Sequence, residues 1–387
     1  MSKTKEILII LVIIIVSGLS GIIANRYIFP RLAMTKFFGK YDFIKKSTEN
    51  ITVINKTEQV FIKEDSSINK IVSQVTSSVV NITSYAAPEK NALSGKNTNT
   101  TTQLVIKSGT GLIVASDGLI VTYASAIIPE NAKYKVIVSD KNIYDATLIE
   151  IDSYSNLAFL KINASNLSVA SFANSDEAKP GEKIIAIGND LPASAPFFAA
   201  GILSSFNPSY NLSEKTIASS EKLEGVFEID NSRQNRYLGG PVVDYSGQII
   251  GITGSVRRDN ADSFFQIPSN KVKLVIEKEL RKELSMNLLL GIYYISIDKA
   301  YALINNLPSE TGAQIYSPSG QQGLSVIANS PADIAGLKIN DIITEVSGEK
   351  ITIEKSLPDL LYKHKKGEEI ELTILRNSQE LKIKIQM

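Results

Sequence analysis

The feature that most constrains the fold is a succession of short apolar runs separated by turn residues, between Leu104 and Pro268. Asp117-Gly118 stands between two of these runs, and Asp-Gly in such a place is the strongest short-range signal for a β-hairpin. Tyr245–Ile252 repeats the pattern around Ser246-Gly247. Many short strands with frequent turns are typical of an all-β sandwich or barrel, which is the fold expected here. The other runs expected to form strands are 134–138, 145–151, 157–162, 183–188, 198–204 and 226–229.

The pattern changes near Pro268 and Ser269, which are expected to begin a helix with an apolar stripe that ends at Leu284. After Met286, about 100 residues remain, which suits one small α+β domain. Its strands are expected near 290–297, 323–328, 341–346, 369–375 and 380–386, and its helices near 298–306 and 356–364.

The N-terminal run Ile7–Ala24 carries no charge. As a helix it would span about 27 Å, close to the thickness of the hydrocarbon layer of a membrane. A cleaved signal peptide with a site at Gly18-Leu19-Ser20 is the alternative. A retained anchor is favoured, because the apolar run continues through Ile22 and Ile23. Basic residues stand on both sides of the run, so charge alone does not set its orientation.

The segment between this anchor and the β-rich region is polar with scattered aromatic residues, which indicates a stalk or else a self-association segment. Residues 51–63 are strand-like. Ser66 or Ser67 is expected to cap a short helix whose apolar face runs from Ile68 to Val75. Residues 84–103 are rich in Asn, Thr, Gly and Lys and are expected to form a loop.

Composition excludes several kinds of site. The 41 basic and 40 acidic residues give a net charge of +1, which leaves no electrostatic footprint for nucleic acid. The absence of cysteine excludes disulfides, thiolate catalysis and cysteine-bound metals. His364 is the single histidine, so a multi-histidine metal site is excluded, and neither a metal nor a cofactor is expected. Any Ser-His-Asp triad would have to use His364.

Three stretches carry recognisable motifs: Asp230 followed by Leu238-Gly239-Gly240-Pro241, Gly109–Thr122 and Asp152–Ile162. They resemble the HtrA/DegP/DegS family of serine proteases, and the first is similar to the segment that carries the family nucleophile. Gly109–Thr122 is similar to the stretch that leads to the family histidine, and Asp152–Ile162 to the stretch around the family aspartate. The resemblance implies a trypsin-like double β-barrel over residues 67–285.

The C-terminal region, residues 286–387, resembles the PDZ domain of the same family. The matching stretches are Leu290-Gly291-Ile292, Ser330–Ala332, Ala335–Lys338 and Asn340–Ile343. The whole layout then reads as a mostly β protein with a transmembrane anchor at 1–25, a stalk at 26–66, the barrel domain and one PDZ domain. It implies a single-pass membrane protein whose bulk is extracytoplasmic, and a homo-oligomer, in this family a trimer.

The residues that carry catalysis in the family are replaced here. The family histidine falls on Ser125, the aspartate on Asn156 and the serine on Leu238. Leucine has no lone pair for attack, and serine cannot act as a base near neutral pH. The glycine two residues before the nucleophile falls on Arg236, beside the turn whose backbone N–H groups stabilise the oxyanion. The resemblance therefore implies a serine endopeptidase fold without catalytic residues.

Two other functions stay open. A relocated hydrolase site could use Ser125, Ser205 or Ser232 with a lysine or carboxylate base, although no spacing recommends a particular pair. The chain could also be a non-catalytic subunit that partners an active HtrA protease. His364 lies at a helix end in a cationic cluster, where it complements the helix dipole.

In the resembled PDZ domains, a loop directs backbone N–H groups at the carboxylate of a peptide C-terminus, and the peptide adds as a strand. That loop corresponds here to Leu289, Leu290, Gly291 and Ile292, and the opposite wall to a helix with Leu357, Leu360 and Leu361. The alternative is that these leucines belong only to the core. A β-branched residue at Gly291 is expected to impair binding more than stability. The function expected is the binding of polypeptides or peptide C-termini, in envelope protein quality control or signalling.

Overall fold

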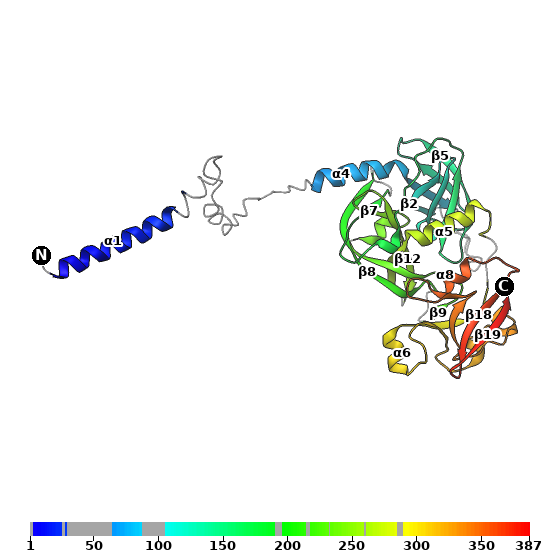
Figure 1. Cartoon of the computed structure of the whole chain (residues 1–387). Helices are drawn as coiled ribbons and strands as arrows, with labels where there is room; N and C mark the ends of the chain where they lie inside the picture. The colour runs from blue at the N-terminus through cyan, green and yellow to red at the C-terminus, as the bar shows by residue number, and fades with distance from the viewer. Residues whose placement is uncertain are drawn as a thin grey trace, which may run out of the picture. The chain divides into compact units, whose positions relative to one another are not determined.

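The computed structural model describes residues 3–24, 28, 64–86, 105–189, 196–213, 217–231, 233–258, 261–284 and 289–387. The described residues fall into two units, one within Met1–Ile62 and one within Lys63–Met387 (Figure 1). The strand-like run 51–63, most of the predicted stalk and residues 87–103 of the predicted loop lie outside the described residues.

The described part of the first unit is helix α1, Lys3–Ile23. It covers most of the apolar run Ile7–Ala24. Within it, the hydroxyl of Ser20 donates a hydrogen bond to the carbonyl of Val16 at 2.7 Å. Across the described residues, no helix combines the length and the apolar character needed to cross a membrane.

The second unit begins with helix α4, Glu64–Val75, which confirms the short helix predicted there. The predicted cap is wrong, because the helix begins at Glu64 and Ser66 and Ser67 lie inside it. Its buried face, Ile71, Val72 and Val75, belongs to the large hydrophobic cluster of the barrels. Ile71 also lies next to the turn at Gly247, so the helix packs against the second barrel.

The first barrel closes in the strand order β1-β2-β3-β6-β5-β4. The hairpin predicted at Asp117-Gly118 is confirmed, and Gly118 has φ +96° with a carbonyl 2.5 Å from where a Cβ would stand. The loop predicted from Ser84 is wrong for its first residues, because Ser84–Ala86 pair with β2 in register. The bounds are β1 Val79–Ala86, β2 Val105–Ala115, β3 Leu119–Tyr123, β4 Lys133–Ile137, β5 Ile143–Ile151 and β6 Leu157–Ile162.

The second barrel closes in the order β10-β13-β12-β11-β7-β8. Strand β8 is longer than the predicted run 198–204, because bulges in its pairing with β10 let it bend and continue. Helix α5, Ser269–Leu280, begins after the last strand as predicted, but it ends before Leu284. The bounds are β7 Lys183–Gly188, β8 Phe197–Asn211, β10 Glu224–Asp230, β11 Pro241–Val243, β12 Ile249–Arg258 and β13 Ala261–Pro268.

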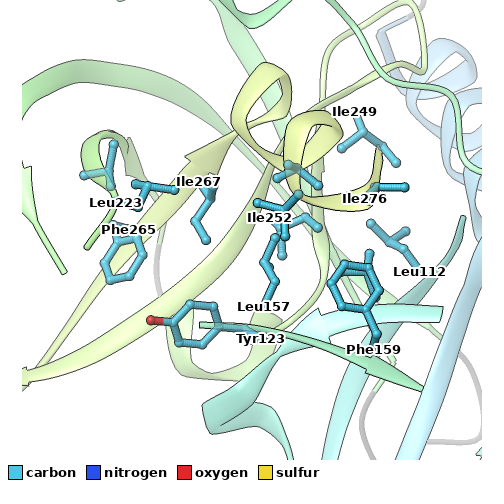
Figure 2. Packing of buried hydrophobic residues seen from close by; sticks show 14 of the residues in the cluster. Leu112, Tyr123, Leu157, Phe159, Leu223, Ile249, Ile252, Phe265, Ile267 and Ile276 are labelled. Atoms are coloured by element: carbon cyan, nitrogen blue, oxygen red, sulfur yellow. The ribbon is translucent and has the colours of Figure 1, made fainter. Parts of the chain in front are cut away.

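The two barrels share one hydrophobic cluster (Figure 2). Leu112 and Phe159 of the first barrel belong to it with Ile252 of the second. Tyr123 meets Phe265 edge to face, with ring centroids 5.8 Å apart. Because both barrels bury side chains in the same core, they form one domain.

The C-terminal domain, residues 289–387, is built on a sheet in the order β19-β18-β16-β15-β14-β9. The strand predicted at 323–328 is wrong. The region holds a 3₁₀ turn, η7 (Gln322–Leu324), and a single bridge between Ile292 and Val326. The bounds are β14 Tyr293–Ile297, β15 Gly312–Ile315, β16 Ile342–Val346, β17 Glu349–Lys350, β18 Glu369–Arg376, β19 Gln379–Gln386, α6 Lys299–Asn305, α7 Pro331–Ile334 and α8 Leu357–Tyr362.

Strand β9, Ala218–Ser219, comes from the barrel domain, between β8 and β10, and yet completes the C-terminal sheet. It pairs antiparallel with β14, Tyr293 opposite Ser219 and Tyr294 opposite Ala218. The two domains are therefore joined by shared backbone pairing as well as by side chains.

Helix α8 faces the barrels beside α5 (Figure 1). Asp359 accepts hydrogen bonds from Lys271 at 2.7 Å and from the hydroxyl of Tyr154. Tyr154 also stacks on Tyr362 with ring centroids 4.0 Å apart, and the ammonium of Lys278 lies 4.0 Å from the ring of Tyr362. A partly buried ion pair and stacked rings thus fasten this helix to the barrel domain.

Glu224 is a buried carboxyl group at the same junction. It accepts hydrogen bonds from the hydroxyls of Tyr294 (2.6 Å) and Ser296 in β14. Burial raises the pKa of Glu224 from 4.5 to about 7, although these bonds and the nearby charge of Lys271 act to lower it. The negative charge of Asp359 acts in the same direction as burial.

We expect Glu224 to make stability depend on pH. Because its pKa is higher in the folded chain, the proton stabilises the fold fully below pH 4.5. That stabilisation falls as the pH rises toward and past 7, by about 3 kcal/mol in all. Glu224→Gln has no proton to lose, so the difference between the unfolding free energies of the two chains should change across this window. Urea denaturation from pH 4.5 to 8 measures it, and parallel profiles would contradict the assignment.

Candidate functional site

Ser125, Asn156 and Leu238 all lie where the two barrels meet. Ser125 is in the 3₁₀ turn η4, Ala124–Ala126, and the N–H of Ala124 donates to the carbonyl of Asn156 at 2.9 Å. The hydroxyl of Ser125 lies 2.9 Å from that of Ser255 in β12. Gly239, next to Leu238, donates its N–H to Thr253 in the same strand. Strand β12 therefore brings the turns that carry Ser125 and Leu238 close to each other.

The side chains of Ser125, Asn156 and Leu238 make hydrogen bonds or apolar contacts that differ from those within a Ser-His-Asp triad. Ser125 pairs with a second hydroxyl, and neither hydroxyl is a base near neutral pH. The amide of Asn156 donates to the hydroxyl of Tyr123 at 3.3 Å and accepts from Lys222 at 3.2 Å. Leu238 packs half-buried against the hydrophobic cluster shared by the barrels.

The turn before Leu238 is held by a hydrogen bond between its own residues. Arg233 has the left-handed φ of 58°, and the 3₁₀ turn η6 (Gln234–Tyr237) follows it. The N–H of Arg236 donates to the carbonyl of Arg233 at 3.0 Å, so this donor is engaged within the turn. The guanidinium of Arg236 lies 4.1 Å from the centre of the Phe197 ring. A donor held in this way is not directed at a developing oxyanion.

The other serines considered as nucleophiles lie elsewhere. Ser205 in β8 donates to the carboxylate of Glu228 at 2.8 Å, and Asn207 donates to the same carboxylate at 3.0 Å. Ser232 lies outside the described residues.

The predicted leucines of the peptide site are mostly core residues. Leu290, Ile292, Leu357 and Leu360 belong to the buried cluster of the C-terminal domain, whereas Leu289 is 51% exposed. Leu361 belongs to the same cluster, and it also borders a small hollow lined by Ser220 and Glu221 of the barrel domain.

The predicted carboxylate loop is occupied by the chain itself. The N–H of Gly291 donates to a carboxylate oxygen of Glu221 at 2.8 Å. The N–H of Ile292 donates to the hydroxyl of Ser220 at 3.2 Å, and its carbonyl accepts the N–H of Ser220 at 3.1 Å. Together with β9, these residues define the Ala218–Glu221 segment. Sequence reasoning missed it, because four small or polar residues between strands give no periodic signal.

Gly291 is required by the internal packing of the C-terminal domain. Its φ is +86°, and a Cβ there would stand 2.3 Å from the Cβ of Ser330. A β-branched residue would therefore clash inside the domain, so the expectation that it impairs binding more than stability does not hold.

Comparisons with known proteins agree with this architecture. The model of the trypsin-like peptidase domain matches residues 109–252, and that of the PDZ domain matches residues 290–387. "Serine protease Do-like HtrA" of Bacillus subtilis is 29% identical over 349 residues, which cover 84% of this chain and 74% of the relative. "Serine protease HTRA1" of Xenopus tropicalis is 29% identical, over 72% of this chain and 59% of its own length.

Among solved structures, "HtrA-type protease AlgW with tripeptide" matches with a TM-score of 0.61 at 21% identity. The match covers 82% of this chain and 95% of that one. Domain order, closed barrels and relatives agree, and the chain therefore belongs to the HtrA/DegP family, with a trypsin-like peptidase domain followed by one PDZ domain.

Proposed function

We propose that this chain is a catalytically inactive HtrA-family protein that binds polypeptides through its PDZ domain. The observation that carries the proposal is the contact at Gly291, whose N–H holds a carboxylate at 2.8 Å beside a strand edge that accepts a partner. The loop at Gly291 and the edge of β14 thus make the two kinds of contact by which a peptide end is recognised.

Inactivity is supported by the chemistry of the replaced residues. Leu238 has no nucleophilic atom, and Ser125 is paired with a hydroxyl instead of a base. The backbone N–H of Arg236 donates to the carbonyl of Arg233 within the same turn. Because nucleophile, base and orienting group act as a unit, repairing one of them restores almost nothing.

Peptide binding is supported by the energetics of the groove. Backbone pairing supplies affinity with little demand on sequence, and a carboxylate accepts strong, charge-assisted bonds from N–H groups. The AlgW structure, which has this fold, holds a tripeptide. Attachment to a membrane remains a prediction from the uncharged run Ile7–Ala24 and the resemblance, and an extracytoplasmic location and a homo-oligomer remain predictions from the resemblance.

We predict that the chain neither cleaves unfolded casein nor reacts with a fluorophosphonate probe. The same negative result is expected for Leu238→Ser, because a hydroxyl without a base stays unreactive. Mass spectrometry of the probe-treated chains measures labelling, with an active serine protease as the positive control. A labelled serine whose mutation abolishes both labelling and cleavage would establish a relocated catalytic site instead.

We predict that Glu221→Ala, which vacates the loop, binds peptides with a free apolar C-terminus at affinities of order 1 μM, about −8 kcal/mol. The matched amidated peptides should bind at least ~10-fold more weakly, since they offer the loop no charge. Titration calorimetry on the full chain compares each pair. Equal affinity for the acid and the amide would remove the carboxylate assignment, and no binding of either would remove the peptide-binding function.

A further inference from the structure

We propose that the Ala218–Glu221 segment is an intramolecular ligand that occupies the peptide site of the PDZ domain, at Gly291 and the edge of β14, when no external peptide is bound. External peptides would then bind only when this segment leaves β14. The inference rests on the proposed peptide-binding function and adds the regulation of that site.

The segment reproduces the backbone pairing of a bound peptide. Ser220 exchanges hydrogen bonds with Ile292, donating its N–H to the carbonyl at 3.1 Å and accepting at its hydroxyl from the N–H at 3.2 Å. Ala218 stands opposite Tyr294, two residues further along both strands. These pairs occupy the edge of β14 that a peptide ligand would need, so the segment and a peptide exclude each other.

A side chain supplies the carboxylate. One oxygen of Glu221 accepts from Gly291 at 2.8 Å and from the hydroxyl of Ser220 at 2.6 Å. The other oxygen accepts from the hydroxyl of Ser219 at 2.6 Å. The negative charge therefore rests among donors at the place where the terminal carboxylate of a ligand would lie.

The segment also supplies an apolar contact. Ala218 is 9% exposed and belongs to the buried cluster of the PDZ domain, although it comes from the barrel domain. The cluster also contains Ile292 and Tyr294 of the edge that it pairs with. A methyl group thus fills the position where an external peptide would place a side chain.

Side chains of the barrel domain hold the Ala218–Glu221 segment beside β14. The side-chain amide of Asn211 donates to the carbonyls of Ser219 (3.1 Å) and Lys222 (2.9 Å). Lys222 in turn donates to the carbonyl of Ser153 at 2.6 Å and to the amide oxygen of Asn156 at 3.2 Å. A competitor tethered in this way acts as if present at about millimolar concentration or more, which exceeds a micromolar ligand.

A reversible lock tests the proposal. Tyr293 and Ser219 are directly opposite, and the N–H of Tyr293 bonds away from β9, to Ser325 at 2.9 Å. In such non-hydrogen-bonded pairs the side chains are closest, which suits a disulfide. The chain has no cysteine of its own, so Ser219→Cys with Tyr293→Cys forms one engineered bond that a reductant opens selectively.

We expect the oxidised double variant to lose binding of free-acid peptides and the reduced form to regain it. Glu371→Cys with Lys384→Cys, opposite each other on β18 and β19, is the matched control and should bind equally in both redox states. Glu221→Ala should bind about tenfold more tightly than the unmodified chain, because the open fraction increases. Glu182→Ala, an exposed carboxylate of the barrel domain, should change nothing.

The outcomes separate this inference from the function on which it rests. Equal binding by the oxidised and reduced lock, with wild-type affinity for Glu221→Ala, overturns the intramolecular ligand and leaves peptide binding intact. No binding by the reduced lock, Glu221→Ala or the unmodified chain overturns the peptide-binding function itself. Circular dichroism and the unfolding midpoint of each variant establish that it is folded before binding is scored.

Discussion

The open edge of β14 determines how the two domains are joined. Backbone N–H and carbonyl groups at a sheet edge need partners, and an unpaired edge attracts another strand. Here the barrel domain supplies that strand, so Tyr294 and Ser296 come within reach of the buried carboxyl of Glu224. The ion pair between Lys271 and Asp359 forms across the same junction. Backbone pairing, a buried carboxyl group and an ion pair thus all lie at the junction between the two domains.

The barrel domain keeps its fold although Ser125, Asn156 and Leu238 stand at the positions that the resemblance assigns to catalysis, because different residues serve the fold and the site. The shared core depends on side chains such as Phe159 and Ile252, which pack tightly whatever stands at the surface of the junction. Catalysis would depend on three side chains, and here a leucine packs onto the core while an asparagine binds a lysine. Fold and function are thus separable at the level of single residues.

Much of the architecture was predictable, because it follows from local patterns. The Asp117-Gly118 hairpin, most strands of the first barrel and helix α5 each carry their own periodicity or turn chemistry. Strand β15 was missed because it is a short run opened by Gly312, and its sheet neighbours lie far away in sequence. The Ala218–Glu221 segment could not be predicted from local sequence either, because Ala218 and Ser219 become a strand only through contact with β14.

The backbone of the Ala218–Glu221 segment does not end where Glu221 places its carboxylate, and this bears on the sequences that the proposed peptide site would accept. Glu221 offers its charge from a side chain, while the backbone continues to Lys222 and turns back into the barrel domain. The loop therefore leaves room for a polypeptide to pass through. Under the proposed peptide-binding function, a partner would need no free terminus, because an acidic residue that follows small side chains in an internal, extended stretch offers the same contacts. Searches for clients should then include internal motifs in unfolded regions as well as protein tails.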